Sequence, residues 1–199
     1  MLRVGITGGI GSGKTALTDW LATQGIVIVD ADLAARVVVQ PGQPALADII
    51  ETFGAEILLP DGQLDRTALR QLVFSDEKQR KALEAITHPR IRDELVRQMS
   101  EANSPYVVLS SPLLLESGQS EMVDVSVVVD VPETLQIERT MTRDQNNRQL
   151  VEQIMAAQLG RETRIARSDI VIDNSTSLDA LYKRAAVLHE TLLAHAAAH

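Results

Sequence analysis

The sequence feature that most constrains the fold is the stretch 8–15, which reads Gly-Gly-Ile-Gly-Ser-Gly-Lys-Thr. It matches the phosphate-loop pattern G-x-x-x-x-G-K-[ST] at every required position. The preceding residues 2–7 are short, aliphatic and β-branched, as in a strand, whereas Leu17, Trp20 and Leu21 follow at helical spacing. A glycine loop between a strand and a helix is the context in which this pattern binds phosphate, so the sequence predicts a nucleotide-phosphate site here.

The residue types in this loop suit the chemistry of phosphate binding. Glycines let successive backbone N–H groups face one anion, and the helix that follows adds the partial positive charge of its N-terminus. Lys14 is expected to reach the β- and γ-phosphates of ATP, and the Thr15 hydroxyl to bind Mg²⁺. The predicted nucleotide-binding residues are therefore Gly9, Gly11, Ser12, Gly13, Lys14, Thr15 and Ala16.

Two other interpretations of the same stretch stay open. A glycine-rich turn with an exposed lysine would need no ligand. Gly11, Gly13 and Ala16 also satisfy the dinucleotide fingerprint G-x-G-x-x-[GA], and Asp30 lies near the distance expected for a ribose-binding acid. The Lys-Thr pair after Gly13 favours the phosphate loop, because a dinucleotide site does not require it.

Composition narrows the class of protein. A chain of 199 residues suits one domain with a small inserted lobe, and 45% hydrophobic but only 3% aromatic residues predict an aliphatic core. The formal net charge of −8 argues against a nucleic acid or an anionic membrane as a partner. The absence of cysteine excludes disulfides and thiolate metal sites. With no leader and no apolar run of about eighteen residues, we expect a soluble cytoplasmic protein, a monomer or weak homo-oligomer.

Five apolar runs of strand length predict the sheet, at 2–7, 26–29, 106–111, 123–131 and 169–174. Continuous runs such as 26–29 are typical of parallel strands covered on both faces. The predicted fold class is therefore α/β, a P-loop three-layer α/β/α arrangement with a five-stranded parallel sheet. The expected core comprises 1–32, 103–135 and 166–199, with a lid over 136–165.

A helical lobe is expected over 33–102, where the periodicity is helical and no strand is predicted. Gly54 ends one helix, Asp65 has the position of an N-cap, and His88-Pro89 interrupts the helical pattern. A crossover between parallel strands needs only about a dozen residues, so this much longer insertion predicts a lobe that holds a second substrate.

Acidic residues follow the second predicted strand. The ligands of open α/β sheets gather at the carboxyl ends of strands, so Asp30 and Asp32 are candidates to accept a substrate proton or to hold Mg²⁺ through water. For Asp30, a helix cap is an equal alternative to a functional role. Ser110 and Ser111 end the third strand without an acid, so Glu116 or Asp32 must supply any acid there, although a surface role for Glu116 stays open.

Arginines gather between positions 139 and 167, a stretch without lysine. Their planar guanidinium groups suit phosphate oxygens, and mobile lids carry such groups onto a transferring phosphoryl group. A lid role is favoured for Arg139 and Arg143, whereas surface ion pairs are an equal alternative for Arg148, Arg161, Arg164 and Arg167. Asn174 is expected near the nucleotide base, with a turn-forming role as the plainer alternative.

Several short motifs follow one another in a specific order. They are Thr7 to Lys14, Asp30-Ala31-Asp32 with Ala35-Arg36, Phe53-Gly54, Asp61-Gly62 with Leu64-Asp65-Arg66, His88-Pro89-x-Ile91, Pro112-Leu113-Leu114-x-Glu116, Arg139 with Arg143, Ala157-Gln158, and Asp169-x-Val171-Ile172-x-Asn174. Together they resemble the dephospho-CoA kinase family over nearly the whole chain. The phosphate loop is shared by many families, whereas the ordered set is much more specific.

The resemblance implies an enzyme that uses ATP and Mg²⁺ to phosphorylate the ribose 3′-hydroxyl of dephospho-CoA. By the resemblance, Asp32 is the base, Lys14, Arg139 and Arg143 complete the catalytic set, and the substrate-binding residues are Asp32, Arg36, Arg66, His88, Leu113 and Glu116. Two positions depart from the pattern. Many members carry an acid where this chain has Ser110, and a basic residue in the lid helix where it has Gln153-Ile154.

Other functions stay as alternatives. Another small P-loop kinase, acting on a nucleoside or nucleotide, would share the core and the lid and differ in the lobe. A GTPase-type switch predicts an Asn-Lys-x-Asp motif and an Asp-x-x-Gly motif, and the sequence contains neither. A dinucleotide-dependent oxidoreductase predicts binding of NAD without Mg²⁺.

Overall fold

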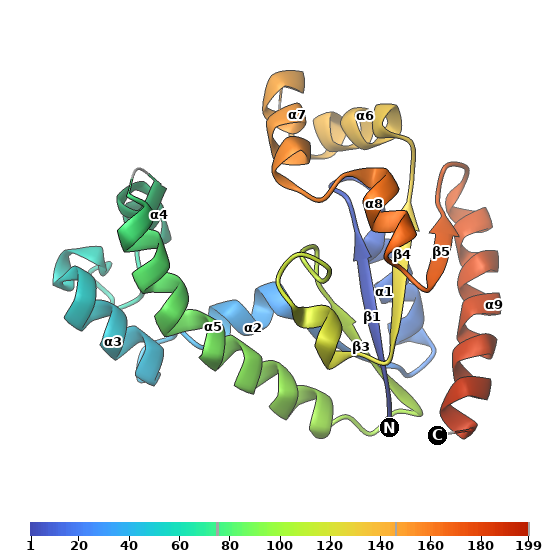
Figure 1. Cartoon of the computed structure of the whole chain (residues 1–199), viewed down its shortest axis with the longest axis horizontal. Coiled ribbons are helices and arrows are strands. Elements are labelled where there is room, and N and C mark those ends of the chain that lie inside the picture. Colours follow the sequence, from blue (N-terminus) through green and yellow to red (C-terminus); the bar gives the residue numbers. More distant parts are fainter. Residues whose placement is uncertain (75, 146, 199) are drawn as a thin grey trace. The chain divides into compact units, whose positions relative to one another are not determined.

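The computed structural model describes residues 1–74, 76–145 and 147–198. The chain divides into two compact units. The core unit comprises Met1–Val29 and Glu101–His199, and the helical unit comprises Asp30–Ser100. Figure 1 shows the sheet in the first and the helices of the second.

A five-stranded parallel sheet forms the centre of the core unit, which confirms the predicted α/β fold. Its spatial order is β2-β3-β1-β4-β5, so β1 lies between β3 and β4. From β1 the chain first forms β2 and β3 on one side and then β4 and β5 on the other. Open α/β sheets bind ligands at the point where the strand order reverses in this way. The strands are β1 (Leu2–Gly8), β2 (Val27–Asp30), β3 (Tyr106–Ser110), β4 (Val125–Asp130) and β5 (Ile170–Asp173).

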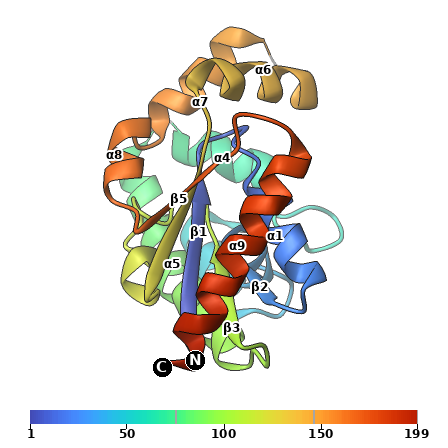
Figure 2. The same ribbon diagram turned by 90° about the vertical axis from the view of Figure 1, so that its right-hand side faces the viewer.

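Helices α1 (Lys14–Thr23) and α9 (Leu178–Ala197) cover one face of this sheet (Figure 2). Alternate residues of β1 pack into the resulting core, together with Leu181, Leu188 and Leu192 of α9, the leucines that the helical periodicity places on one face. Gly5 belongs to the opposite face, where Leu114 and Val123 of the β3–β4 connection approach it. That connection contains the short helix η2 (Gln119–Met122).

Strand β2 lies at the edge of the sheet. Its apolar run favoured a strand covered on both faces and did not indicate this position. Val29 is buried, whereas Val27 and Ile28 are only half-buried. An apolar run indicates that a strand can be buried, but it does not indicate where the strand lies in the sheet. That position is set by pairing with strands distant in sequence.

Three helices follow β4 in the region predicted as a lid. They are α6 (Glu133–Asp144), α7 (Arg148–Ala157) and α8 (Arg161–Ala166). Both views place them at the end of the sheet where β1 ends (Figures 1 and 2). Helix α8 also contacts β4. The lid boundaries 136–165 and the motion of a lid stay predictions.

The helical unit consists of α2 (Ala31–Val37), α3 (Pro44–Phe53), η1 (Ala55–Ile57), α4 (Arg66–Phe74) and α5 (Glu77–Ser100). Gly54 ends α3 at a φ of 90°, and the Asp65 carboxylate caps α4 by accepting from the N–H groups of Thr67 and Ala68 at 3.0 Å. In the described part of this unit, the only β pairing is the isolated bridge between Leu58 and Leu64. The apolar faces of α3, α4 and α5 meet in a separate core.

Helix α5 contradicts the expected interruption at His88-Pro89, because it continues through Pro89. Proline removes one backbone donor from the helix, but Arg90 Nη1 donates to the Ile86 carbonyl at 2.7 Å in the same turn. Leu83, Ile86 and Ile91 on both sides of the proline pack on the core of the unit. Tertiary packing thus outweighs the local cost of a proline.

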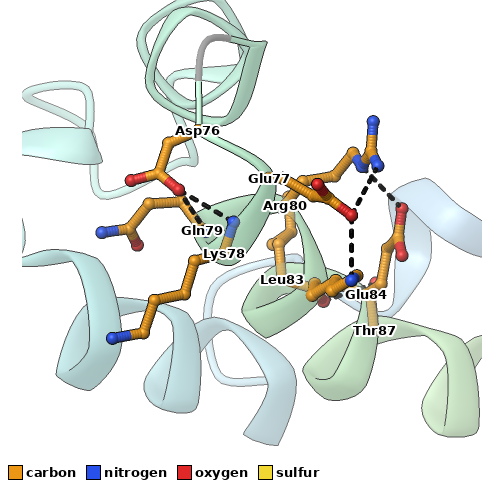
Figure 3. Close-up of polar contacts among 9 residues, drawn as sticks. Asp76, Glu77, Lys78, Gln79, Arg80, Leu83, Glu84 and Thr87 are labelled. Carbon is orange, nitrogen blue, oxygen red and sulfur yellow. Dashed lines mark hydrogen bonds and ion pairs between the residues drawn. The ribbon is translucent and has the colours of Figure 1, made fainter.

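The first turns of α5 are stabilised by polar contacts (Figure 3). Asp76 caps the helix by accepting from the N–H groups of Lys78 and Gln79, at 2.8 and 3.2 Å. Glu77 pairs with Lys81 one turn later, at 2.9 Å. These contacts stabilise the start of the helix, whereas packing on the core of the unit accounts for its continuation past Pro89. No described helix of the chain is long and apolar enough to cross a lipid bilayer.

Candidate functional site

The loop between β1 and α1 has the geometry of a phosphate loop. It turns through a hydrogen bond from Ser12 N to the Gly9 carbonyl at 3.0 Å. Gly11 and Gly13 have φ values of 73° and 87°, in the left-handed region that favours glycine. Gly13 is the N-cap of α1 and supplies no side-chain acceptor, so the first N–H groups of the helix have no side-chain cap. These donors are suited to an anion, and the predicted strand–loop–helix context is confirmed.

Side chains from outside the loop pack closely against it. A Cβ at Gly9 would lie 2.4 Å from Gln136 Oε1, and a Cβ at Gly11 would lie 2.6 Å from Thr140 Oγ1. Both neighbours belong to α6 and are buried. The loop therefore requires glycine at these positions for space, and α6 forms one wall of the site.

Two polar side chains from outside the loop form hydrogen bonds with its backbone. Asn174 Nδ2, at the end of β5, donates to the Ser12 carbonyl at 2.8 Å. The backbone N–H of Ile10 donates to Gln158 Oε1 at 3.0 Å. Asn174 was predicted to contact the nucleotide base, and the structure gives its amide a different partner while leaving the base contact a prediction.

Lys14 donates from Nζ to Ser110 Oγ. Ser110 ends β3 and is buried, and it lies beside Ile6 in the β1–β3 register. The position at which many family members carry an acid therefore holds a neutral hydroxyl in contact with the phosphate-loop lysine.

Thr15 is exposed in the first turn of α1, and no described residue forms a hydrogen bond with its hydroxyl. Among the described residues, no group of three or more His, Cys, Asp or Glu side chains is placed to hold a metal ion. Mg²⁺ usually keeps several waters and binds nucleotide phosphates with few protein ligands. The single hydroxyl of Thr15 fits that mode of binding. The described residues do not form a Mg²⁺ site made of protein ligands alone.

The two favoured lid arginines differ in their surroundings. Arg143 is exposed and binds Asp144, with Nε and Nη2 donating at 2.7 and 2.8 Å. This hydrogen-bonded pair raises the pKa of Arg143 and lowers the pKa of Asp144. Arg139 is half-buried and makes no contact with a described charged residue. The surface ion pair is confirmed for Arg148, which binds Glu152 at 2.7 Å.

Arg164 is the residue that sequence reasoning did not single out. It is 5% exposed, and its guanidinium lies beside Gly9, where a Cβ would be 2.8 Å from Nη2. Burial lowers the pKa of Arg164, while the nearby Glu116, Asp130 and Glu133 raise it. No signal within the sequence separates Arg164 from Arg161 or Arg167. Only the packing of α8 on the phosphate loop does.

Arg161 has a different role. Its Nε and Nη2 donate to the two carboxylate oxygens of Asp130, at 2.8 and 2.6 Å. Hydrogen bonding to Asp130 raises the pKa of Arg161. This bidentate pair joins the start of α8 to the end of β4.

Four predicted site residues belong to the helical unit. The open question about Asp30 is resolved in favour of capping, since its Oδ1 accepts from the N–H groups of Asp32 and Leu33 at 2.8 and 3.0 Å. Asp32 and Arg36 are exposed and lie one turn apart on α2, so the structure brings these two side chains to one helix face.

Arg66 and His88 are also exposed, at the start of α4 and within α5. Neither side chain forms a hydrogen bond or an ion pair with Asp32 or Arg36, nor with the other, among the described residues. Their predicted binding of dephospho-CoA is not tested by any contact.

Leu113 and Glu116 lie in the β3–β4 connection of the core unit. Leu113 is 46% exposed. Glu116 Oε1 accepts from the N–H of Leu159 at 3.0 Å, next to the loop-binding Gln158. Glu116 therefore anchors the segment after α7, and this contact explains the position of its side chain. A role of Glu116 in substrate binding stays a prediction.

Comparisons with known proteins agree on one family. A family model described as dephospho-CoA kinase matches residues 2–180. Over 191 residues, the chain is 47% identical to a dephospho-CoA kinase of Idiomarina loihiensis, covering 96% of this chain and 95% of the relative. A dephospho-CoA kinase of Acinetobacter baylyi is 46% identical over 195 residues, covering 98% of this chain and 100% of the relative.

A solved structure supports the same fold. TT1252 from Thermus thermophilus is similar with a TM-score of 0.82 and 34% sequence identity, covering 95% of this chain and 97% of that one. The similarity thus extends over the sheet, the helices after β4 and the helical unit, and the resemblance carried by the ordered motifs is confirmed.

Proposed function

The chain belongs to the dephospho-CoA kinase family, and we propose that it transfers the γ-phosphoryl group of ATP to the ribose 3′-hydroxyl of dephospho-CoA, giving coenzyme A and ADP. As a member of this family, it is an ATP-dependent phosphotransferase. The observation that carries the proposal is the phosphate loop, whose glycines, helix N-terminus and Lys14 form a site for nucleotide phosphates at the end of β1.

The core unit supplies the nucleotide site. Loop N–H groups and the N-terminus of α1 bind the phosphate oxygens, and Lys14 stabilises the negative charge of the β- and γ-phosphates. Phosphoryl transfer needs positioning and charge stabilisation rather than a covalent intermediate. Arg139 and Arg143 add positive charge from the lid when the Asp144 contact of Arg143 is exchanged for phosphate.

The helical unit supplies residues that bind the acceptor substrate. Asp32 orients the ribose hydroxyl and accepts its proton late in the transfer. Arg36, Arg66 and His88 are exposed cations or hydrogen-bond donors suited to the phosphates of dephospho-CoA. Leu113 and Glu116 of the β3–β4 connection complete the proposed acceptor-binding set.

Mg²⁺ is the proposed metal, held by the Thr15 hydroxyl together with nucleotide oxygens and water. When bound, the ion neutralises charge on the β- and γ-phosphates. Ser110 leaves the Mg²⁺ site with a hydroxyl where an acid is common, which makes Thr15 the main protein ligand in this proposal.

An ADP-release assay tests the reaction. The purified chain is incubated with ATP and Mg²⁺ and, in separate reactions, with dephospho-CoA, adenosine, AMP, other nucleoside monophosphates, shikimate or no acceptor. ADP formed only with dephospho-CoA, and a product heavier by one phosphoryl group, are the expected results.

Other outcomes would reject parts of the proposal. ADP formed with a different acceptor would keep the phosphate loop and replace the substrate. ADP formed equally without an acceptor would indicate an ATPase and would remove the role given to Asp32. Omission of Mg²⁺ should abolish turnover, and full activity with a chelator present would reject the metal.

A further inference from the structure

The phosphate loop is surrounded by buried polar atoms that have no partner. Ser12 Oγ, Thr140 Oγ1 and Arg164 Nη1 are buried and form no hydrogen bond with any described residue. Ser12 belongs to the loop, Thr140 Oγ1 is 2.6 Å from the position of a Cβ at Gly11, and Arg164 Nη2 is 2.8 Å from that at Gly9. A buried polar group without a partner is costly, so this concentration of unpaired donors at one loop indicates a binding site.

Arg164 is the decisive member of this group. Arginine is rarely buried without a paired anion, and leaving its charge buried and unpaired is strongly destabilising. The nearby acids do not supply a partner. Asp130 is occupied by Arg161 at 2.6 Å, Glu116 Oε1 accepts from Leu159 N at 3.0 Å, and the exposed Glu133 forms no ion pair with a described residue. The guanidinium is thus held in place with open donor capacity.

A ligand suited to these donors is anionic and rich in acceptor oxygens. The guanidinium and the two hydroxyls can all donate, and a guanidinium fork matches phosphate geometry. The position along the loop distinguishes between the phosphates of a nucleotide. Loop amides ahead of the helix cradle the α- and β-phosphates, whereas Gly9 lies at the strand end of the loop, five residues before Lys14.

We propose that Arg164 binds the γ-phosphate of ATP and acts as a catalytic residue of the transfer. Arg164 differs from Arg143, which is exposed and paired with Asp144. Although α8 belongs to the region predicted as a lid, Arg164 is already buried beside Gly9 in this structure, so its charge acts where water is excluded. The proposal rests on the proposed kinase function, since it assigns a further residue to the same site.

Nucleotide binding to the Arg164→Gln variant tests this proposal. Affinity for ADP and for the non-hydrolysable ATP analogue AMPPNP is measured by calorimetry with Mg²⁺, alongside kcat with dephospho-CoA. Loss of a charge-assisted hydrogen bond should weaken AMPPNP binding by about tenfold or more. ADP affinity should stay within about twofold, and kcat should fall by about 10²-fold.

The matched control is Arg167→Gln, an exposed arginine immediately after α8, which should leave all three quantities within about twofold of the wild type. Equal weakening of ADP and AMPPNP binding in Arg164→Gln would show that Arg164 only holds the loop in shape. Unchanged AMPPNP affinity would also reject the proposal.

A second variant keeps the test valid if Arg164→Gln does not fold. Arg164→Lys keeps the charge and loses the planar fork, and it should give a smaller loss that is again confined to AMPPNP. The binding comparison needs no acceptor. If the wild type shows no activity with dephospho-CoA, the substrate assignment fails, whereas the ADP and AMPPNP affinities still decide the role of Arg164.

Discussion

At the scale of single residues, Lys14 connects the phosphate loop to β3 through Ser110 Oγ. A neutral hydroxyl accepts from the ammonium group, so the contact orients Lys14 without neutralising it. We expect Lys14→Ala to lower kcat/KM by about 10²-fold or more, because charge stabilisation of the transferring group is lost.

Lys183→Ala is the control for this prediction, since Lys183 is an exposed lysine on α9. It should keep kcat/KM within about twofold of the wild type. Steady-state kinetics with dephospho-CoA check both variants, and turnover of Lys14→Ala near the wild-type value would contradict the role of the lysine.

The neighbouring acids Asp30 and Asp32 allow a sharper comparison. Asp30 caps α2, and asparagine caps helices as well as aspartate does, so Asp30→Asn should fold and keep most of its turnover. Asp32→Asn should lower kcat by about 10²-fold or more, as expected for loss of a general base, while the KM for ATP changes little.

Parallel measurements of kcat and of the KM for ATP on the two variants check this prediction. If Asp32→Asn retained full turnover, or if both variants lost the same activity, the assignment of Asp32 as the base would be wrong.

At the scale of elements, β4 and β5 are joined by a hydrogen-bonded pair at their start. Asp169 Oδ2 accepts from the N–H and the hydroxyl of Ser126, at 2.7 and 2.6 Å. These bonds lower the pKa of Asp169 below its usual range. The stabilisation is therefore complete above about pH 4, the ordinary aspartate pKa, and is lost as the pH falls through the lower pKa of the folded state.

Urea unfolding of Asp169→Asn checks this pH dependence. At pH 7 the variant should unfold at a lower urea concentration than the wild type, and the difference should shrink as the pH is lowered from about 4 toward 2. Asp19→Asn, an exposed position on α1, should show no such convergence. A difference that stayed constant with pH would contradict the explanation.

At the scale of the whole molecule, a chain with a net charge of −8 binds a polyanionic nucleotide. The negative charge of the molecule makes local cations and backbone donors the source of affinity. Lys14 and Arg164 lie at the phosphate loop, whereas Arg148 and Arg161 form ion pairs elsewhere in the core unit.

Nucleotide binding should therefore raise the melting temperature. At a concentration of Mg²⁺–ATP about one hundred times Kd, binding raises the free energy of unfolding by about 2.7 kcal/mol. For a protein of this length, that corresponds to a shift of about 5–10 °C. Thermal melts with Mg²⁺–ATP and with NAD check this expectation. An equal shift with NAD would favour the dinucleotide interpretation of the loop.

The sequence by itself determined the features that depend on neighbouring residues. The phosphate loop, the Asp65 cap and the buried face of α9 arise from spacing and local backbone chemistry, and all three were predicted. The family could also be recognised, because its motifs keep their order along the chain. Local chemistry left Asp30 undecided between a cap and a ligand.

Only the tertiary structure decided the features that depend on partners distant in sequence. Helix α5 continues through Pro89 because its two halves pack on one core, and β2 is at the edge because of how the strands pair. Arg164 resembles its neighbours in sequence but is buried against Gly9, which lies 155 positions earlier. The physical reason is common to all three. Packing energies depend on which surfaces come into contact, and no local sequence pattern indicates which surfaces these are.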